Sequence, residues 1–310
     1  MLKTAAAKIA WVGRPTSMVF GLALVMALSS CGSGSQETKN PANSTPNVIE
    51  GRFDVGDYKL YMRCEGSGSP TVVYFHGYIE EPASGGASNA GEIPSMLRDK
   101  HRICVYDRAN VGRSDDVPGL RTGKSSVTDL HRLLDAAGVE PPYVLLGASF
   151  GGLISYSYAA TYPEEVAGMV LLDAIVPGLL ELERYWPKEE RLWNVPKAEW
   201  SSAEEKIDQY DVNVYAQKHA GQVPDIPVTY LLATPNPGEG WEGPPAWTEA
   251  VLDELPEYVE SFNPGVLKKV ESPHYMEPVI PERIAKEVET LIASTSQQGA
   301  AHDGEASKKK

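Results

Sequence analysis

A serine set between glycines, in Gly147-Ala148-Ser149-Phe150-Gly151, is the residue of this sequence best suited to nucleophilic chemistry. Residues 143–146 before it are apolar and typical of a buried strand, and the residues after it favour a helix. A turn between such a strand and such a helix has to be sharp, and glycines on both sides let the two elements approach closely. The pattern predicts a serine hydroxyl exposed at the edge of a sheet. Because a serine hydroxyl is a poor nucleophile at its ordinary pKa, it needs a neighbouring base.

Three further segments accompany this turn, and their order along the chain is informative. They are His76-Gly77-Tyr78, residues 106–114 (Tyr-Asp-Arg-Ala-Asn-Val-Gly-Arg-Ser), and Ser272-Pro273-His274 followed by Pro281. Together with the serine turn they resemble the α/β-hydrolase family over residues 49–294, although Asn110 and Pro273 stand where glycine is commoner. The resemblance implies an α/β fold of the α/β-hydrolase type, with a mainly parallel twisted sheet, helices on both faces and a helical cap insertion.

The resemblance also implies a role for each matched residue. Ser149 would be the nucleophile, and His274 the general base that takes its proton and later protonates the leaving group. The backbone N–H groups of Tyr78 and Phe150 would form the oxyanion hole, and His76 would support that loop by hydrogen bonding. We therefore expect an esterase- or lipase-like serine hydrolase that cleaves a carboxylic ester through an acyl-enzyme.

The acid of the catalytic triad is an open choice. In most of the family it follows the strand before the histidine, but here that strand, residues 228–234, is followed by Asn236, and the nearest carboxylates are Glu239 and Glu242. Some members place the acid after the preceding strand, where this chain has Asp173. We expect Asp173 to be the acid, with Glu239 or Glu242 as the alternatives.

The fold alone does not fix the reaction. Peptide, thioester or C–C bond hydrolysis and cofactor-free haloperoxidation are alternatives, and so is a non-catalytic surface protein that keeps the fold for binding. Dehalogenases and epoxide hydrolases of this fold use an aspartate nucleophile, so Ser149 argues against both. No cofactor is expected. No group of His, Cys or carboxylate residues has the spacing of metal ligands, so no metal is expected either.

Strands and helices must alternate to bring these residues together. A hairpin is expected over residues 49–64, strands at 71–75, 102–106, 143–146, 166–172, 228–232 and 266–270, and helices over 125–138 and 282–292. Strands separated by helices predict a mainly parallel sheet covered on both faces. Residues 177–226 interrupt the alternation and predict a helical cap. Its aromatic side chains either contact a small apolar ester or form the core of the cap: Tyr185, Trp186, Trp193 and Trp200.

The first thirty residues resemble a bacterial lipoprotein signal peptide. Three basic residues precede an apolar run over 18–28, and Leu28-Ser29-Ser30-Cys31 is similar to a lipobox. The resemblance implies cleavage before Cys31, a lipid on its sulfur, and export to the extracytoplasmic face of the bacterial cell envelope, with the membrane bound through the anchor. Residues 31–48 are expected to form a flexible tether, and residues 295–310 a disordered tail.

The net charge of the chain argues against one class of binding partner. The chain has 310 residues and a formal net charge of −14, from 28 Lys and Arg against 42 Asp and Glu. A chain this acidic repels phosphate backbones, so nucleic acid is not expected as a partner. The resemblance to the α/β-hydrolases implies a small-molecule substrate instead. Apart from Cys31, the cysteines are Cys64 and Cys104. In an oxidising compartment these two would form a disulfide if their strands are neighbours, and otherwise they are buried thiols.

Overall fold

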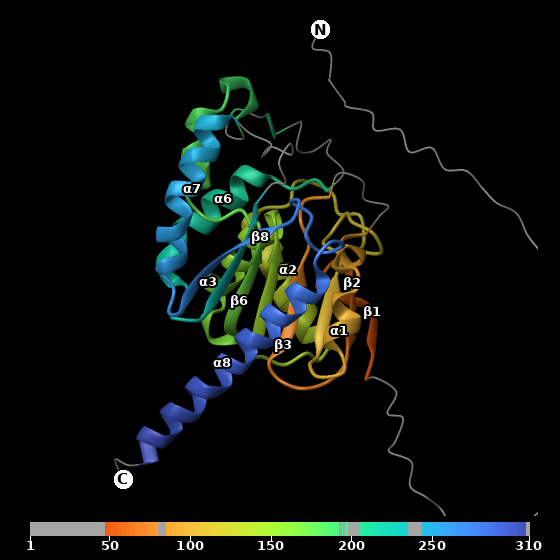
Figure 1. Ribbon diagram of the computed structural model, residues 1–310. Helices are drawn as coiled ribbons and strands as arrows, with labels where there is room; N and C mark the ends of the chain where they lie inside the picture. Colours follow the sequence, from red (N-terminus) through yellow and green to blue (C-terminus); the bar gives the residue numbers. More distant parts are fainter. Residues whose placement is uncertain are drawn as a thin grey trace, which may run out of the picture. The chain divides into compact units, whose positions relative to one another are not determined.

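The computed structural model describes residues 47–79, 85–191, 194, 196–197, 205–234 and 244–307. Within them a central sheet of eight strands has the order β1-β2-β4-β3-β5-β6-β7-β8 (Figure 1). The strands are β1 (Ile49–Asp54), β2 (Lys59–Glu65), β3 (Thr71–Phe75), β4 (Ile103–Tyr106), β5 (Tyr143–Ala148), β6 (Val166–Leu172), β7 (Val228–Thr234) and β8 (Gly265–Glu271). β2 pairs antiparallel with β1 and β4, and all other neighbours are parallel. The predicted α/β-hydrolase type of sheet is confirmed.

Helices cover both faces of this sheet. α2 (Gly123–Ala136), α3 (Phe150–Thr161), α6 (Gln209–Lys218) and α7 (Pro245–Glu260) lie on one face, and α1 (Ile93–Leu97) and α8 (Pro281–Ser307) lie on the other. Alternate residues of β3 show the division, since Val73 and Phe75 pack under α2 and α3 while Val72 and Tyr74 pack under α1 and α8. Central strands that are buried on both faces explain the continuous apolar runs in the sequence.

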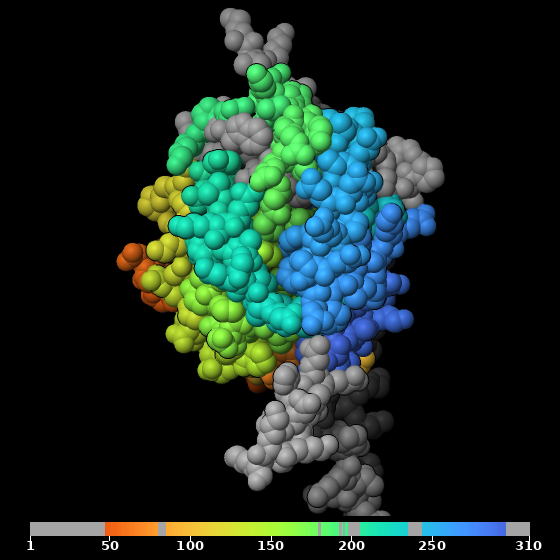
Figure 2. All heavy atoms as spheres, turned by 90° about the vertical axis from the view of Figure 1, so that its left-hand side faces the viewer, coloured from red at the N-terminus to blue at the C-terminus, as the bar shows by residue number. Residues whose placement is uncertain are grey.

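The segment between β6 and β7 differs in part from the cap expected over residues 177–226. Its first part contains α4 (Leu179–Leu182), whereas α6 belongs to the layer that covers the sheet. The apolar face of α6 is buried against α2 and α3, and Asp211 accepts a hydrogen bond from the N–H of Gly123 at 2.8 Å. Figure 2 shows α6 (teal) and α7 (blue) on one face, with residues that follow β6 (green) between them.

Two of the four aromatic residues expected in the cap are described. The Trp186 ring packs edge-on against the Trp247 ring of α7, with 5.7 Å between centroids, while the Tyr185 side chain is partly exposed. Trp186 is half-buried and packs against α7, which lies outside residues 177–226, so this contact does not belong to a core within the cap. Trp193 and Trp200 lie outside the described residues.

The C-terminal helix is longer than the sequence pattern indicates. α8 continues to Ser307 and so runs into residues 295–310, the segment expected to form a disordered tail. Residues 293–307 contain no proline, so every residue of this stretch keeps the backbone N–H that a helix requires. Residues 308–310 and residues 1–46, with the expected signal peptide, Cys31 and most of the tether, lie outside the described part. None of the described helices combines the length and the apolar character that crossing a bilayer requires.

A disulfide joins the two remaining cysteines. Cys64 of β2 and Cys104 of β4 are direct partners in the antiparallel pairing of these strands, and their sulfur atoms are bonded. Both side chains are completely buried. The bond therefore ties the N-terminal hairpin to the sheet that carries the candidate site.

Candidate active site

Ser149 occupies the turn between β5 and α3. Its φ of 50° and ψ of −122° lie in a region that costs energy for a residue other than glycine. The turn is held in place, because Ser149 N–H donates to the Leu172 carbonyl at 2.9 Å and the Ser149 carbonyl accepts from Ile175 N–H at 3.0 Å. Gly151 is required by close approach, since a Cβ there would lie 2.2 Å from the Phe75 carbonyl oxygen.

His274 follows β8, and its imidazole lies between the serine and a carboxylate. Nε2 is 2.9 Å from Ser149 Oγ, and Nδ1 is 2.7 Å from Asp173 Oδ2. In the tautomer that suits both contacts, Nδ1–H donates to the Asp173 carboxylate and Nε2 accepts from the serine hydroxyl. The resulting chain of hydrogen bonds allows an imidazole to take the serine proton.

Asp173 follows β6, and its own contacts fix the direction of its carboxylate. Its N–H donates to the Leu231 carbonyl at 2.8 Å, and Oδ1 accepts from Ala233 N–H at 3.1 Å, which leaves Oδ2 to His274. Its side chain is only 8% exposed, whereas that of His274 is 45% exposed. The structure thus brings Asp173 to the histidine. Asn236 and the alternatives Glu239 and Glu242 lie outside the described residues.

Residues 76–79, which follow β3, form a loop beside Ser149. A Cβ on Gly77 would lie 3.5 Å from Ser149 Cβ, and the Tyr78 ring packs edge-on against the Phe150 ring with 6.1 Å between centroids. Phe150 is the first residue of α3, where backbone N–H groups have no acceptor within the helix. The expected oxyanion donors therefore belong to two segments that flank the serine.

His76 lies fully buried behind this loop. Burial, and after it the charge of Arg108, holds the pKa of His76 well below its usual value, so the ring is neutral. Nδ1 lies 2.8 Å from the Gly77 carbonyl oxygen, and Nε2 lies 3.4 Å from the Arg108 backbone nitrogen. Because a carbonyl only accepts and an amide N–H only donates, the hydrogen is on Nδ1. The ring supports the loop, as expected, through its hydrogen bond to the Gly77 carbonyl.

Asn110 shows why the family's commoner glycine can be replaced here. Its φ of 69° lies in the left-handed region, which asparagine tolerates better than most residues. The side chain then makes bonds that glycine lacks. Oδ1 accepts from Val117 N–H at 2.6 Å, and Nδ2 donates to the backbone carbonyl of Glu205 at 3.1 Å.

Arg108 and Glu205 complete the surroundings of the loop, and sequence reasoning assigned neither of them a role. Arg108 donates from Nη1 to the His76 carbonyl and from Nη2 to the Gly77 carbonyl, both at 2.7 Å, and it forms an ion pair with Glu205. Arg108 lies inside the matched segment 106–114, so its position could have pointed to it. Glu205 belongs to no motif.

A pocket of about 380 Å³ opens at Ser149 and His274, and Tyr78, Asn89 and Glu277 contribute to its wall. Glu277 is 5% exposed and accepts a hydrogen bond from the Tyr74 hydroxyl at 2.6 Å. Burial raises the pKa of Glu277 more than this hydrogen bond lowers it. In the described part of the chain, no cluster of three or more His, Cys, Asp or Glu side chains is arranged to hold a metal ion.

Comparison with known proteins gives a match to a family model. Residues 70–220 match the model for the alpha/beta hydrolase fold. The chain is 36% identical over 111 residues to the uncharacterized protein YqjL of Bacillus subtilis (strain 168), a match that covers 35% of this chain and 41% of that protein. The chain spans about two fifths of the length of the curated relatives that it matches first.

Solved structures resemble the chain over most of its length. A thermophilic esterase from Thermogutta terrifontis has a TM-score of 0.52 at 20% identity, with 79% of this chain and 98% of that chain covered. A loop variant of the haloalkane dehalogenase DbeA from Bradyrhizobium elkanii has a TM-score of 0.60 at 13% identity, with 83% and 100% covered. Together with the strand order and the turn at Ser149, these matches identify the chain as a protein of the α/β-hydrolase fold.

Proposed function

We propose that this protein is a serine hydrolase that cleaves a carboxylic ester through an acyl-enzyme. The observation that carries the proposal is the hydrogen-bonded chain from Asp173 through His274 to Ser149, with distances of 2.7 and 2.9 Å. The strained backbone at Ser149 adds support, because the fold keeps a costly conformation at the residue whose hydroxyl faces the imidazole.

In the proposed reaction, Ser149 Oγ attacks the ester carbonyl carbon while its proton passes to His274 Nε2. The electron pair of the carbonyl moves to its oxygen, and the N–H groups of Tyr78 and Phe150 stabilise this oxyanion. The bond to the alcohol then breaks, and His274 gives its proton to the leaving oxygen. Water attacks the acyl-enzyme in the same manner, which releases the acid and restores Ser149. The Asp173 carboxylate holds the imidazole in the required tautomer and stabilises the imidazolium.

The substrate that the site supports is a small ester. Ligand pockets have volumes of roughly 300–1,000 Å³, and the pocket at Ser149 has about 380 Å³. We expect kcat/KM on p-nitrophenyl esters to be highest for acyl chains of about two to six carbons, the lengths that fit a small pocket. A maximum at long acyl chains would contradict a small-ester substrate and would point to a lipid.

Labelling with a fluorophosphonate tests the nucleophile, because the oxygen of an activated serine attacks the phosphorus of this reagent and displaces fluoride. The wild-type protein and Ser261→Ala, which removes an exposed serine, should label equally. Ser149→Ala and His274→Ala should not label, and Asp173→Asn should label about 10³–10⁴-fold more slowly. A folded wild-type protein that stays unlabelled, or label that persists in Ser149→Ala, would overturn the proposal.

We also propose that the protein is exported and held at the cell envelope by a lipid on Cys31. The support is the lipobox-like sequence over residues 28–31 and the positive charges before its apolar run. Expression in a bacterium with an alkyne-bearing fatty acid should label the wild-type protein in the membrane fraction. Cys31→Ser should lose both the label and the membrane association, and label retained on that variant would exclude this anchor.

A further inference from the structure

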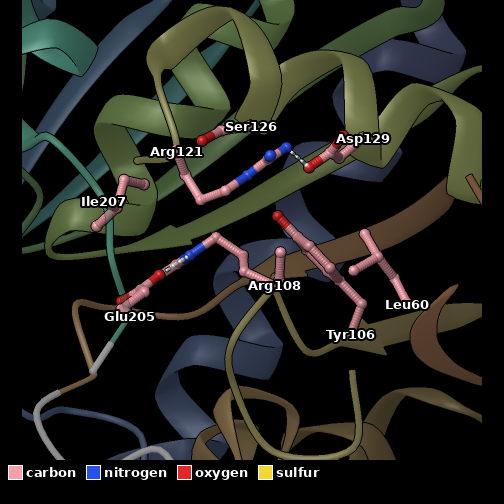
Figure 3. Close-up of a pocket in the computed structure, with 9 residues that line it drawn as sticks. Leu60, Tyr106, Arg108, Arg121, Ser126, Asp129, Glu205 and Ile207 are labelled. Carbon is pink, nitrogen blue, oxygen red and sulfur yellow. Dashed lines mark hydrogen bonds and ion pairs between the residues drawn. The ribbon is translucent and has the colours of Figure 1, made fainter. Parts of the chain in front are cut away.

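A buried ion pair lies behind the loop that carries Tyr78. The side chains of Arg108 and Glu205 are 6% and 1% exposed, and the two come from segments that are 97 residues apart (Figure 3). Removing two charges from water carries a desolvation penalty, which their attraction offsets only when further hydrogen bonds satisfy both groups. Both side chains make such bonds here, and most of these bonds involve residues 76–79.

Arg108 and His76 together fix the direction of the Tyr78 N–H. Arg108 Nη2 donates to the Gly77 carbonyl at 2.7 Å and His76 Nδ1–H donates to it at 2.8 Å, and that carbonyl belongs to the same peptide unit as the Tyr78 N–H. In a planar trans peptide the C=O and N–H bonds point in opposite directions. A guanidinium that holds the carbonyl on one side therefore directs the N–H to the other side. Nη1 holds the preceding carbonyl, that of His76, at 2.7 Å and so prevents the loop from rotating.

Glu205 holds the same loop from its other end. Its Oε1 accepts from Arg108 Nε, and its Oε2 accepts from the N–H of Ile79 at 3.0 Å. A single carboxylate thus fixes the guanidinium and the residue that follows Tyr78. The backbone at Glu205 is itself held, since its carbonyl accepts from Asn110 Nδ2 and the next carbonyl, that of Lys206, accepts from Arg121 N–H at 2.7 Å.

We propose that Glu205 is a positioning residue, which aligns the Tyr78 N–H for the oxyanion through Arg108 and Ile79. Glu205 lies in the segment between β6 and β7. This segment therefore determines the position of the Tyr78 N–H, although the N–H itself belongs to the loop after β3. The inference rests on the proposed serine hydrolase activity, because an oxyanion donor has meaning only if Ser149 attacks a carbonyl.

A second ion pair in the same region provides a matched control. Arg121 and Asp129 line the same small cavity as Arg108 and Glu205, and their side chains are 14% and 11% exposed (Figure 3). Asp129 also accepts a hydrogen bond from the Tyr58 hydroxyl at 2.6 Å. None of the hydrogen bonds described for Asp129 involves residues 76–79. Its neutralisation disturbs a buried ion pair without a direct effect on the loop.

The test compares Glu205→Gln with Asp129→Asn in the full chain, with p-nitrophenyl butyrate as substrate. For Glu205→Gln we expect kcat to fall about 10- to 100-fold with KM changed less than about threefold, because a displaced donor is lost mainly in the transition state. Asp129→Asn should lower the melting temperature but change kcat less than about threefold. Equal losses of kcat in the two variants would show a general effect of charge removal and would overturn the proposal.

The affinity of ketone inhibitors distinguishes a positioning role of Glu205 from a purely structural one. A trifluoromethyl ketone adds to the serine as a hemiketal oxyanion, and it should bind Glu205→Gln more weakly by the same factor as kcat falls. The matching methyl ketone, which forms little hemiketal, should bind both proteins alike. Unchanged affinity for the trifluoromethyl ketone would overturn the inference.

Two further controls distinguish failure of this inference from a folding defect and from failure of the proposed hydrolase activity. If Glu205→Gln does not fold, Arg108→Lys gives the same comparison, because lysine keeps the buried cation but lacks the planar fork that spans two carbonyls. Wild-type kcat and trifluoromethyl ketone affinity in folded Arg108→Lys would overturn the inference. A wild-type protein that fails to react with fluorophosphonate would instead exclude the hydrolase itself.

Discussion

Four residues other than glycine have left-handed backbone angles in the part of the chain that the structure describes. Asn110, Ser149, Asp173 and Lys206 have φ values of 69°, 50°, 41° and 49°. Ser149 and Asp173 belong to the proposed triad, Asn110 lies two residues after Arg108, and Lys206 directly follows Glu205. Such angles cost about 1–3 kcal/mol each and persist only where the surroundings fix them. At the scale of single residues, strain is therefore concentrated at the triad and at the Arg108–Glu205 pair.

Glu277 leads to a prediction about pH at the same scale. Burial raises its pKa above the ordinary value of 4.5, so folding favours the protonated carboxyl. Its contribution to stability is complete below pH 4.5 and is lost as the pH rises towards and through the raised value. The free energy of unfolding of the wild-type protein, relative to Glu277→Gln, should therefore decrease from pH 4.5 towards neutral pH.

Urea unfolding at a series of pH values measures this difference. Glu260→Gln, which changes an exposed glutamate, serves as the control, and its difference from the wild-type protein should vary less with pH. A difference between the wild-type protein and Glu277→Gln that stays constant from pH 4.5 to 8 would contradict a raised pKa at Glu277.

At the scale of elements, the site depends on how closely α3 approaches the strands beside it. A Cβ on Gly147 of β5 would lie 2.7 Å from the Gly152 Cα, and a Cβ on Gly152 would lie 2.2 Å from the Ala174 Cβ. Glycine at these positions brings the start of α3 against the ends of β3, β5 and β6. Since Phe150 begins the helix and Asp173 follows β6, this close packing determines the distances within the triad.

Gly151→Ala tests the need for close packing. The new Cβ would lie 2.2 Å from the Phe75 carbonyl oxygen and 2.5 Å from the His76 carbonyl oxygen, and neither backbone atom can move freely. We expect a loss of about 1–3 kcal/mol in the free energy of unfolding, together with lower activity. Gly221→Ala is the control, because no atom lies within 4 Å of its Cβ position. Equal stability of the two variants in urea would refute this account of the turn.

The sequence predicted the strands and the turn at Ser149, because their residues form recognisable hydrophobic or glycine patterns. The strands were predictable because buried runs such as residues 71–75 and 166–172 stand out, and the turn at Ser149 has a pattern of its own. The start of α2 was less predictable. A helix was expected from residue 125, but α2 begins at Gly123, after the N-cap Thr122, which forms a reciprocal capping box with Ser125. Glu205 could not be predicted, since its role depends on partners brought near only by the folded chain.

At the scale of the whole molecule, the Cys64–Cys104 disulfide connects the antiparallel edge of the sheet to its parallel centre. β4 pairs with β2 on one side and with β3 on the other, so the bond joins the hairpin of β1 and β2 to the strand beside the loop at residues 76–79. A covalent bond that closes a loop of this length acts mainly on the unfolded chain, because it removes conformations that the chain could otherwise adopt.

Removal of the disulfide should therefore lower stability more than activity. The bond spans 40 residues, and the double variant Cys64→Ser with Cys104→Ser should lose about 2–4 kcal/mol of unfolding free energy. Ester hydrolysis at 25 °C should remain within about threefold of the wild-type rate, since neither cysteine lines the pocket at Ser149. Urea unfolding of the wild-type protein with and without reductant provides the internal control. A double variant as stable as the oxidised protein would show that the bond is dispensable.

The position of Glu205 also limits which segments can be exchanged between this protein and another hydrolase of the same fold. The residues after Asp173 invite replacement by the corresponding stretch of another enzyme in order to change substrate preference. A graft that ends before residue 205 keeps the carboxylate that Arg108 and Ile79 require. A graft that runs on to β7 must supply its own carboxylate at this point, because otherwise the chimera contains a buried, uncompensated guanidinium behind residues 76–79.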